Sequence, residues 1–417
     1  MAQLSDDCFA FGGILMTAAE ALARLDECLT PVAETEAVTI AEAAGRILAE
    51  DVVSHRAVPP HDNAAVDGYA VAFDDLSPEA ETPLPVAGRI TAGHPLKGPA
   101  KKGVAYRIFT GAAMPAGADT VLMQEDCRQD VDRVIIPAGI KQGANRRFAG
   151  EDISAGEIIL SAGRRLRPQD LGLAASVGIA ELETFRPLSV ALFSTGDEIR
   201  DIGGDLPDGC IYDANRYSIA ALLRGLGCIV DDLGILEDRS EPIRAALKGA
   251  AESHDLVMTS AGVSTGEEDH VRAAVESMGS IHFWRLAIRP GRPIALGQIA
   301  RVPFIGLPGN PVAAMVTFMR FARPAILRLA GCTDIDPAFF RVPAAFAYRK
   351  KPSRREWIRA SLVPDESGRF HAEKFPRDGA GILSSMVAAD GLVELDEELT
   401  SVEPGTMVNF LPFNEVQ

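Results

Sequence analysis

The sequence predicts a multidomain α/β plus β protein, and three observations support this fold class. A chain of 417 residues is too long for one compact core, so roughly two to four domains are expected. Across residues 187–331, short apolar runs alternate with amphipathic stretches, which predicts a mainly parallel sheet covered by helices. Short β-prone runs separated by Pro and Gly fill residues 55–151 and return after residue 331, which predicts two additional β-rich units.

The composition excludes several classes of protein. Apolar residues at 47% and charged residues at 24% are typical of a globular enzyme rather than a disordered chain. The formal net charge of −17 argues against a nonspecific nucleic-acid binder, which needs a basic surface. Six cysteines without a Cys-x-x-Cys pair indicate a reduced, cytoplasmic protein. Asp6 and Asp7 stand where a secretory signal would be basic, and Pro308 interrupts the longest uncharged stretch, so we expect neither a signal peptide nor a membrane span.

The predicted elements divide the chain into four regions. Capping-box patterns at 17–20 and 39–42 predict two short helices, and residues 167–178 are also predicted to be helical. The expected regions are a helical N-terminal and linker region (1–54 and 152–186), an inserted small β-module (55–151), an α/β region (187–331) and a C-terminal β-rich region (332–417).

Individual strands and helices follow from the same patterns. Strands of the β-module are predicted at 69–73, 84–90, 104–109, 120–123 and 134–136. Strands of the α/β region are predicted at 189–193, 228–234, 256–259, 281–286, 294–297 and 303–306, and its helices at 215–226, 241–252, 269–278 and 312–329. C-terminal strands are predicted at 341–348, 356–362, 392–395 and 407–413.

Four turns rich in Gly, Ser and acidic residues each follow an apolar run of the α/β region. They span residues 194–198, 234–238, 260–269 and 306–311. Ligands of an open α/β sheet bind outside the carboxyl ends of its strands, so four such turns predict a single site. The glycines and hydroxyls of 262–266 are suited to closing backbone N–H groups around a phosphate, although such loops often only connect elements.

Six carboxylates in these turns form a candidate site for a hard cation. They are Asp197, Glu198, Asp238, Glu267, Glu268 and Asp269. Oxygen ligands without His or Cys suit Mg²⁺, which typically takes one or two carboxylates together with substrate phosphates. Helix capping is the alternative for Asp238 and Asp269. The seven histidines show no ligand spacing, and none is assigned to a metal.

Basic residues and an Asn complete the candidate site of the α/β region. Arg285, Arg289 and Arg292 surround a Pro-Gly turn, where guanidinium groups are able to bind phosphate or another oxyanion bidentately. Surface ion pairs are the alternative for these arginines. Asn310 either contacts a ligand or only starts the helix that Pro311 opens.

The β-module carries motifs whose local context is less informative. Asp67-Gly68 alone is a hairpin signal, and Thr110-Gly111 lies in an ordinary Gly/Pro loop. The segment 146–152 mixes basic and acidic groups at the predicted module boundary and is also consistent with a linker.

Taken together in this order and spacing, the motifs resemble those of the molybdopterin molybdenumtransferase family (MoeA-type, to which the gephyrin E domain is similar). The resemblance covers nearly the whole chain. It rests on Pro59-Pro60, Asp67-Gly68-Tyr69-Ala70, Thr110-Gly111, Gly150-Glu151-Asp152-Ile153, Ser194-Thr195-Gly196-Asp197-Glu198, Gly262-Val263-Ser264, Gly266-Glu267, Asp269 and Pro308-Gly309-Asn310-Pro311.

The resemblance implies both an architecture and a reaction. It implies a molybdopterin-binding-like α/β domain, a β-barrel-like C-terminal domain and an elongated homodimer whose active site lies between the α/β domain of one subunit and the β-module of the other. The implied reaction inserts molybdate into adenylylated molybdopterin with Mg²⁺ and releases AMP. A molybdopterin adenylyltransferase is the implied substrate donor.

The resemblance also implies roles for matching residues. The implied catalytic residues are Asp67, Thr110, Asp152, Glu198, Asp238 and Asp269. Of these, Glu198, Asp238 and Asp269 are the implied Mg²⁺ ligands. The implied contacts to the pterin, its phosphate and the oxyanion are Ser194, Thr195, Gly196, Asp197, Gly262, Ser264, Thr265, Gly266, Glu267, Arg285, Arg289, Pro308, Gly309 and Asn310.

Several positions depart from the family pattern. Residues 64–66 read Ala-Ala-Val where Ser-Ala-Met is common, Ala261 replaces a Gly, and His270 replaces a Tyr. Arginines 285, 289 and 292 replace lysines, which keeps the charge but changes the geometry available to an oxyanion. The alternatives are therefore a diverged pterin-binding scaffold and another Mg²⁺-dependent phosphotransfer enzyme. The retained carboxylates favour the molybdenum-inserting enzyme over the scaffold.

Overall fold

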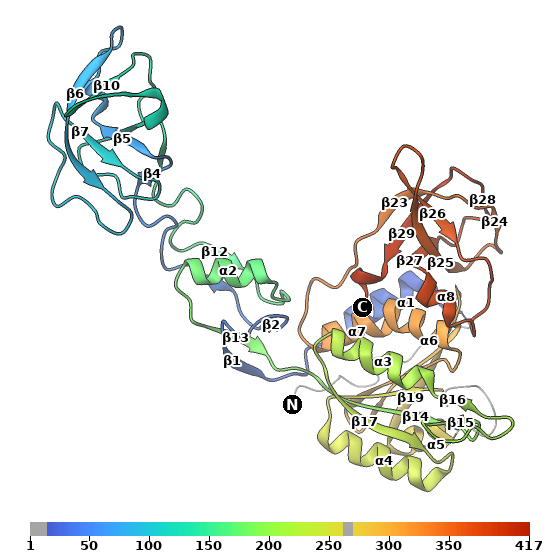
Figure 1. Ribbon diagram of the computed structural model, residues 1–417. Coiled ribbons are helices and arrows are strands. Elements are labelled where there is room, and N and C mark those ends of the chain that lie inside the picture. The colour runs from blue at the N-terminus through green and yellow to red at the C-terminus, as the bar shows by residue number, and fades with distance from the viewer. Residues whose placement is uncertain (1–14, 262–269) are drawn as a thin grey trace.

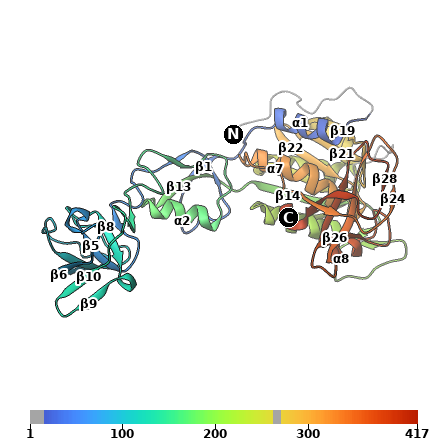
Figure 2. The same cartoon turned by 90° about the horizontal axis from the view of Figure 1, so that it is seen from above.

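The computed structural model describes residues 15–261 and 270–417 and shows an elongated molecule (Figures 1 and 2). A small β-module lies at one end, and a slender connecting region joins it to a larger lobe. In that lobe the α/β sheet and the C-terminal strands lie together. No helix in the described part of the chain is both long and apolar enough to cross a membrane.

The β-module is built on one six-stranded sheet, and the strands predicted there are confirmed. Its order is β8 (Thr120–Met123), β5 (Gly68–Val71), β7 (Ala105–Ile108), β6 (Thr82–Ile90), β10 (Arg133–Ile136) and β9 (Arg128–Asp130). Successive side chains of a strand point to opposite faces of the sheet, so the buried residues form two separate hydrophobic clusters. Ile108 belongs to one cluster and Val134 to the other.

Gly68 begins strand β5, so the hairpin interpretation of Asp67-Gly68 is wrong. The strand pairs with both β7 and β8. A Cβ at Gly68 would lie 1.7 Å from the Leu122 carbonyl oxygen, so the glycine permits close approach of two strands rather than a tight turn.

The connecting region is not mainly helical, contrary to expectation. It contains the antiparallel sheet β1 (Thr35–Thr39), β13 (Glu181–Phe185) and β2 (Ile47–Leu48), the pair β12 (Ile158–Leu160) and β3 (Val52–Val53), and one helix, α2 (Pro168–Ser176). The helix predicted at 39–42 is absent. Thr39 donates to the Glu42 carboxylate at 2.9 Å, but the chain turns at Gly45 and Ile47 then pairs with β13.

The N-terminal helix predicted from the other capping box is confirmed as α1 (Ala18–Cys28). The backbone N–H of Glu20 donates to the Thr17 hydroxyl at 3.2 Å, and the Thr17 N–H donates to the Glu20 carboxylate at 2.8 Å. These reciprocal bonds satisfy free N–H groups at the helix start. Helix α1 contacts α7 of the larger lobe, and Ala21 and Leu25 belong to the core of that lobe.

The α/β region contains the predicted sheet, whose six strands are all present. Its order is β17 (Ile229–Leu236), β14 (Ser189–Thr195), β18 (Leu256–Ser260), β22 (Val302–Leu307), β21 (Pro293–Ile299) and β19 (Gly279–Arg285). The first four strands are parallel, and the last two run antiparallel to their neighbours. The expectation of a mainly parallel sheet is therefore confirmed.

Helices cover both faces of this sheet. They are α3 (Ala214–Gly225), α4 (Ser240–Ser253), α5 (His270–Met278), α6 (Pro311–Thr317) and α7 (Arg323–Leu329). The last two, predicted as one helix, are joined by a π-helical turn at Phe318–Ala322. Leu192 packs with residues of α3 and α6, whereas its neighbour Phe193 packs with α4 and α5. Burial on both faces explains why the strands have nearly continuous apolar sequences.

The C-terminal region forms a curled antiparallel sheet. Its strands are β23 (Phe340–Pro343), β25 (Arg355–Pro364), β26 (Phe370–Lys374), β27 (Gly391–Leu395) and β29 (Met407–Pro412), with the short pair β24 (Tyr348–Arg349) and β28 (Ser401–Val402) beside them. A bridge between Ala344 and Ala372 brings the β23 and β26 ends together. A short strand of the α/β region, β20 (Ile288–Arg289), pairs in parallel with β25.

Candidate active site

The carboxyl ends of the four parallel strands lie side by side at one edge of the α/β sheet. The register pairs Thr195 of β14 with Leu236 of β17. It also pairs Ser260 of β18 with Ser194 on one side and Leu307 of β22 on the other. The four turns identified in the sequence therefore start from the same edge, where ligands of open α/β sheets bind.

The turn after β14 places a carboxylate directly over its glycine. Gly196 has a φ of +140°, and a Cβ there would lie 2.7 Å from a carboxylate oxygen of Glu198. Asp197 and Glu198 are both exposed, whereas Ser194 is fully buried in the strand. Glycine is needed at 196 because any side chain would displace Glu198 and adopt a strained backbone conformation.

The turns after β14 and β17 meet at a shared pocket. The Thr195 hydroxyl donates to a carboxylate oxygen of Asp238 at 3.4 Å. The pocket has a volume of about 480 Å³, and Asp197, Glu237 and Asp238 line it. Oxygen donors from two turns thus face one space at this end of the edge.

The third turn contributes only its first two residues, Ser260 and Ala261, to the described structure. The predicted site residues that lie outside the described residues are Gly262, Ser264, Thr265, Gly266, Glu267, Glu268 and Asp269. Ala261, the residue that precedes them, has a left-handed φ of +75°. A glycine adopts this conformation freely, whereas an alanine is strained in it.

The fourth turn lies against the third and is held from α3. A Cβ at Gly309 would contact the Ala261 Cβ at 3.5 Å. The Asn215 side-chain amide donates to the Gly309 carbonyl at 2.7 Å. Asn310 is the N-cap residue of α6, but its side chain makes no capping hydrogen bond and is exposed. The helix therefore starts through Pro311 without the Asn310 amide.

The loop between β19 and β21 brings the predicted arginines to the same edge. Arg285, the last residue of β19, pairs with Pro293 at the start of β21, and β21 runs antiparallel to β22. The loop therefore leaves the sheet beside the carboxyl end of β22. Arg285, Arg289 and Arg292 are all exposed.

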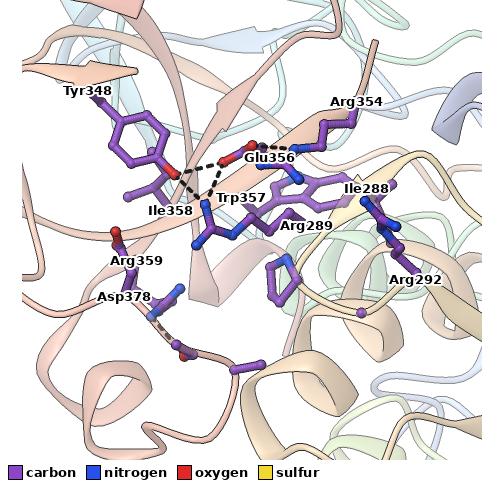
Figure 3. Close-up of a pocket in the computed structure, with 14 residues that line it drawn as sticks. Ile288, Arg289, Arg292, Tyr348, Arg354, Glu356, Trp357, Ile358, Arg359 and Asp378 are labelled. Atoms are coloured by element: carbon purple, nitrogen blue, oxygen red, sulfur yellow. Dashed lines mark hydrogen bonds and ion pairs between the residues drawn. The ribbon is translucent and has the colours of Figure 1, made fainter. Parts of the chain in front are cut away.

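Arg289 and Arg292 line a second pocket, of about 260 Å³, between this loop and the C-terminal sheet (Figure 3). Four arginines and two carboxylates line it: Arg289, Arg292, Arg354, Arg359, Glu356 and Asp378. These side chains leave a formal excess of two positive charges. Arg285 does not line this pocket. Next to it, the Val312 N–H at the start of α6 donates to the Ala380 carbonyl at 2.9 Å, so the pocket adjoins the fourth turn.

Sequence reasoning missed the contribution of the C-terminal region to this pocket. Arg354, Glu356 and Arg359 come from β25 or the residue before it, and Asp378 comes from the loop after β26. One signal was available in the sequence. Arg354, Arg355 and Glu356 directly precede Trp357 at the start of a β-prone run, and charged residues are unusual in a buried strand.

Asp67 and Thr110 contact each other in the β-module. The Thr110 backbone N–H and hydroxyl both donate to one Asp67 carboxylate oxygen at 2.8 Å. The backbone bond, followed by the hydroxyl bond, lowers the pKa of Asp67 because both favour the charged carboxylate. Asp67 precedes β5 and Thr110 follows β7, and both strands belong to the β-module, at the end of the molecule remote from the α/β sheet (Figures 1 and 2).

Asp152 lies near the junction of the β-module and the connecting region. Its backbone N–H donates to the Val58 carbonyl at 3.0 Å, and its side chain is exposed. A single chain therefore does not bring Asp67, Thr110 or Asp152 to the turns of the α/β region.

Comparison with known protein families accounts for almost the whole chain. Residues 16–178 match the MoeA N-terminal region (domains I and II). Residues 191–328 match a probable molybdopterin-binding domain, and residues 341–413 match the MoeA C-terminal region (domain IV).

Individual relatives extend this match over full-length proteins. The chain is 38% identical to the molybdopterin molybdenumtransferase of Haemophilus influenzae over 404 residues, which cover 96% of this chain and 100% of that protein. It is 37% identical to the Nostoc protein of that name over 347 residues, 81% of this chain and 80% of the relative. A solved molybdopterin biosynthesis MoeA protein from Pyrococcus horikoshii superposes with a TM-score of 0.82 at 27% identity, over 95% of this chain and 100% of that one. With three family regions in order and relatives matched from end to end, the chain belongs to the molybdopterin molybdenumtransferase family.

Proposed function

We propose that this chain inserts molybdate into adenylylated molybdopterin in a Mg²⁺-dependent reaction that releases AMP. Family membership makes it a transferase of molybdenum cofactor biosynthesis. Family membership does not favour either alternative, the diverged pterin-binding scaffold or another Mg²⁺-dependent phosphotransfer enzyme. The metal dependence, the leaving group and the roles of individual residues belong to the proposal.

The observation that supports this chemistry best is the division of charge along one edge of the sheet. Three carboxylates and two arginines line the pocket at the turns after β14 and β17, a formal excess of one negative charge, whereas four arginines and two carboxylates line the pocket beside the loop that follows β19. In the strand order, β14 and β19 are four positions apart. Neighbouring strands are about 4.8 Å apart, so the two ends are separated by roughly 19 Å. This separation suits an extended substrate whose phosphoanhydride lies at one end and whose oxyanion lies at the other.

The acidic end fits Mg²⁺ only when substrate oxygens complete its coordination. No three His, Cys, Asp or Glu side chains gather closely enough to hold a metal ion in the described ranges 15–261 and 270–417. Mg²⁺ typically binds one or two carboxylates and takes phosphate oxygens and waters for the rest. Asp238, with the Thr195 hydroxyl bonded to it, and Glu198 are suited to that role. Bound there, Mg²⁺ would neutralise charge on the phosphoanhydride oxygens as AMP leaves.

At the basic end, the arginines would hold the molybdate oxyanion. A guanidinium group donates in a fixed planar fork, which matches two oxygens of a tetrahedral anion. Arg289 and Arg354 line the same pocket from two different regions of the chain. The local excess of positive charge in this pocket would attract the oxyanion. This attraction would act although the net charge of the whole chain is −17.

The proposal includes a homodimer in which the β-module of one subunit completes the site of the other. Its support is the remoteness of Asp67 and Thr110 from the edge within one chain. Exposed large apolar side chains also occur on both parts: Ile202, Leu206, Ile211 and Tyr217 beside the turn after β14, and Met123 and Phe148 on the β-module. We further propose that the reaction takes place in the cytoplasm, with a molybdopterin adenylyltransferase as substrate donor.

A reconstituted reaction tests the proposed function. The purified full-length chain is incubated with adenylylated molybdopterin, Mg²⁺ and molybdate, and AMP release and molybdenum cofactor are measured. We expect AMP and cofactor to appear together and both to stop when EDTA removes Mg²⁺. Tight pterin binding without AMP would support the scaffold, and indifference to the pterin would contradict any role in this pathway.

A further inference from the structure

A chain of polar contacts connects Arg289 to the C-terminal sheet (Figure 3). The Arg289 Nη1 group donates to the Tyr348 hydroxyl at 3.0 Å. That hydroxyl in turn donates to a carboxylate oxygen of Glu356 at 2.7 Å, and the same oxygen lies 3.6 Å from Arg289 Nη1. The three side chains thus form a closed triangle at the pocket wall.

Glu356 is almost completely buried and serves two arginines. Its side chain is 2% exposed, and its other carboxylate oxygen accepts from Arg354 Nε at 2.6 Å. Burial, followed by the bond to Glu356, raises the pKa of Tyr348 to about 12, so the phenol keeps its proton near neutral pH. Charge-assisted hydrogen bonds of this kind fix the direction of a guanidinium plane.

The backbone reinforces the same connection. Strand β20, which carries Arg289, pairs in parallel with β25 and places Arg289 opposite Glu356. Arg289 therefore belongs to the α/β region in sequence, but the C-terminal sheet holds it in space. Its side chain remains 45% exposed toward the pocket, so it is held at one side and accessible at the other.

We infer that Glu356 and Tyr348 are positioning residues that orient the Arg289 guanidinium for an oxyanion substrate. This inference rests on the proposed oxyanion role of the pocket and assigns the C-terminal sheet a part in substrate binding. A long exposed Arg side chain loses rotamer freedom when it binds a ligand. The triangle restricts that freedom before the anion arrives, which increases affinity without any direct contact between Glu356 and the substrate.

A second physical effect predicts the opposite change in oxyanion affinity when Glu356 is neutralised. Glu356 is an anion in a pocket intended for an anion, so Coulomb repulsion alone predicts that its neutralisation strengthens oxyanion binding. Positioning predicts that neutralisation weakens binding, because Gln keeps the shape but loses the charged acceptor that holds two guanidinium groups. Glu356→Gln therefore separates the two by the direction of the change.

The test measures binding of sodium molybdate to the full-length protein by isothermal titration calorimetry. We expect Tyr348→Phe, which removes only the bridging hydroxyl, to raise the dissociation constant about threefold to tenfold, as expected for one hydrogen bond. Glu356→Gln should raise it at least as much. Affinity for adenylylated molybdopterin without molybdate should stay within about twofold for Tyr348→Phe, a split that general destabilisation does not produce.

A double-mutant cycle with Arg289→Ala tests the route of the effect. If Tyr348 acts through Arg289, adding Tyr348→Phe to Arg289→Ala changes molybdate affinity by less than about twofold. Tyr106→Phe, which removes a phenol bonded to the Lys101 backbone in the remote β-module, is the matched control and should leave binding unchanged.

The outcomes distinguish this inference from the proposed function. Wild-type affinity in Arg289→Ala, or no molybdate binding by the wild type, would overturn the oxyanion role and the inference with it. Weakened binding in Arg289→Ala together with unchanged or tighter binding in folded Tyr348→Phe and Glu356→Gln would overturn only the positioning role. If Glu356→Gln does not fold, Tyr348→Phe and the cycle decide the matter.

Discussion

Thr195 and Asp238 join two turns that are distant in sequence, because the Thr195 hydroxyl donates to the Asp238 carboxylate at 3.4 Å. The contact orients one oxygen of Asp238 and leaves the other available to the pocket. It is the direct side-chain link between the turn after β14 and the turn after β17 on which the proposed metal chemistry depends.

Asp238→Ala should lower the rate of AMP release at least about 100-fold, the usual effect of removing a group that stabilises charge in a transition state. The fold should persist, since Asp238 is half-buried in a surface turn. The measurement is single-turnover AMP release with a thermal melt of the same sample. Glu241→Ala, an exposed carboxylate in the first turn of α4, is the control. Wild-type rates in Asp238→Ala would remove this residue from the site.

Gly196→Ala should impair turnover by displacing the Glu198 carboxylate. The new Cβ would lie 2.7 Å from Glu198 Oε2, and the φ of +140° is strained for alanine. The strain is expected to cost about 1–3 kcal/mol, and AMP release should fall at least about tenfold.

Gly203→Ala is the matched control for that experiment. It also places alanine at a positive φ, +85°, but its Cβ would have no atom within 4 Å. It should show a stability loss without the loss of rate. Equal rates in the two variants would mean that the position of Glu198 does not matter to the reaction.

Ala261→Gly should stabilise the larger lobe. Ala261 has a φ of +75°, which is unfavourable for alanine by about 1–2 kcal/mol. The greater chain entropy of glycine when unfolded offsets about 0.4–1 kcal/mol of this gain. We expect the melting temperature of the lobe to rise by roughly 1–4 °C, measured by differential scanning calorimetry. Ala221→Gly, at an exposed position of α3, should lower it, because glycine disfavours helix.

Asp170 should make the connecting region sensitive to acid. Burial alone would raise the pKa of Asp170, but hydrogen bonds from Arg167 and Arg164 outweigh it and lower the pKa to about 2. A depressed folded-state pKa stabilises the fold above the unfolded value near 3.8, and that stability is lost as pH falls toward 2. After allowance for the partly exposed arginines, Asp170→Asn should cost about 1–2 kcal/mol at pH 7.

The difference between wild type and Asp170→Asn should shrink as pH falls from 5 toward 3, measured by urea unfolding of the connecting region. Asp205→Asn, at an exposed position, should leave the curves unchanged at each pH. A constant difference across this range would show that the charge of Asp170 contributes little.

The α/β edge could be predicted from sequence because its information is local. Strands buried on both faces have continuous apolar runs, such as 189–193, and the turn that follows each run is adjacent in sequence. Parallel pairing then brings the turns together without any need to know which strands are neighbours. The turns of the candidate site could be placed at one edge of the sheet for this reason.

Contacts between distant segments could not be predicted in this way. Glu356 has no local sign that it holds Arg289, since the pairing of β20 with β25 depends on how two regions dock. The helix expected at 39–42 failed for a related reason. Its capping residues do contact each other, but pairing of the flanking strands β1 and β2 with β13 determined the local structure.

Because β20 pairs with β25, truncation cannot separate the α/β region from the C-terminal region without breaking a strand pair. A shortened chain that ends after the α/β region would keep Ile288 and Arg289 but lose β25, the partner of their backbone groups. The isolated C-terminal piece would expose the matching edge of β25, and open strand edges promote aggregation. The two pieces are therefore expected to be well behaved only when they are produced together and allowed to reassemble.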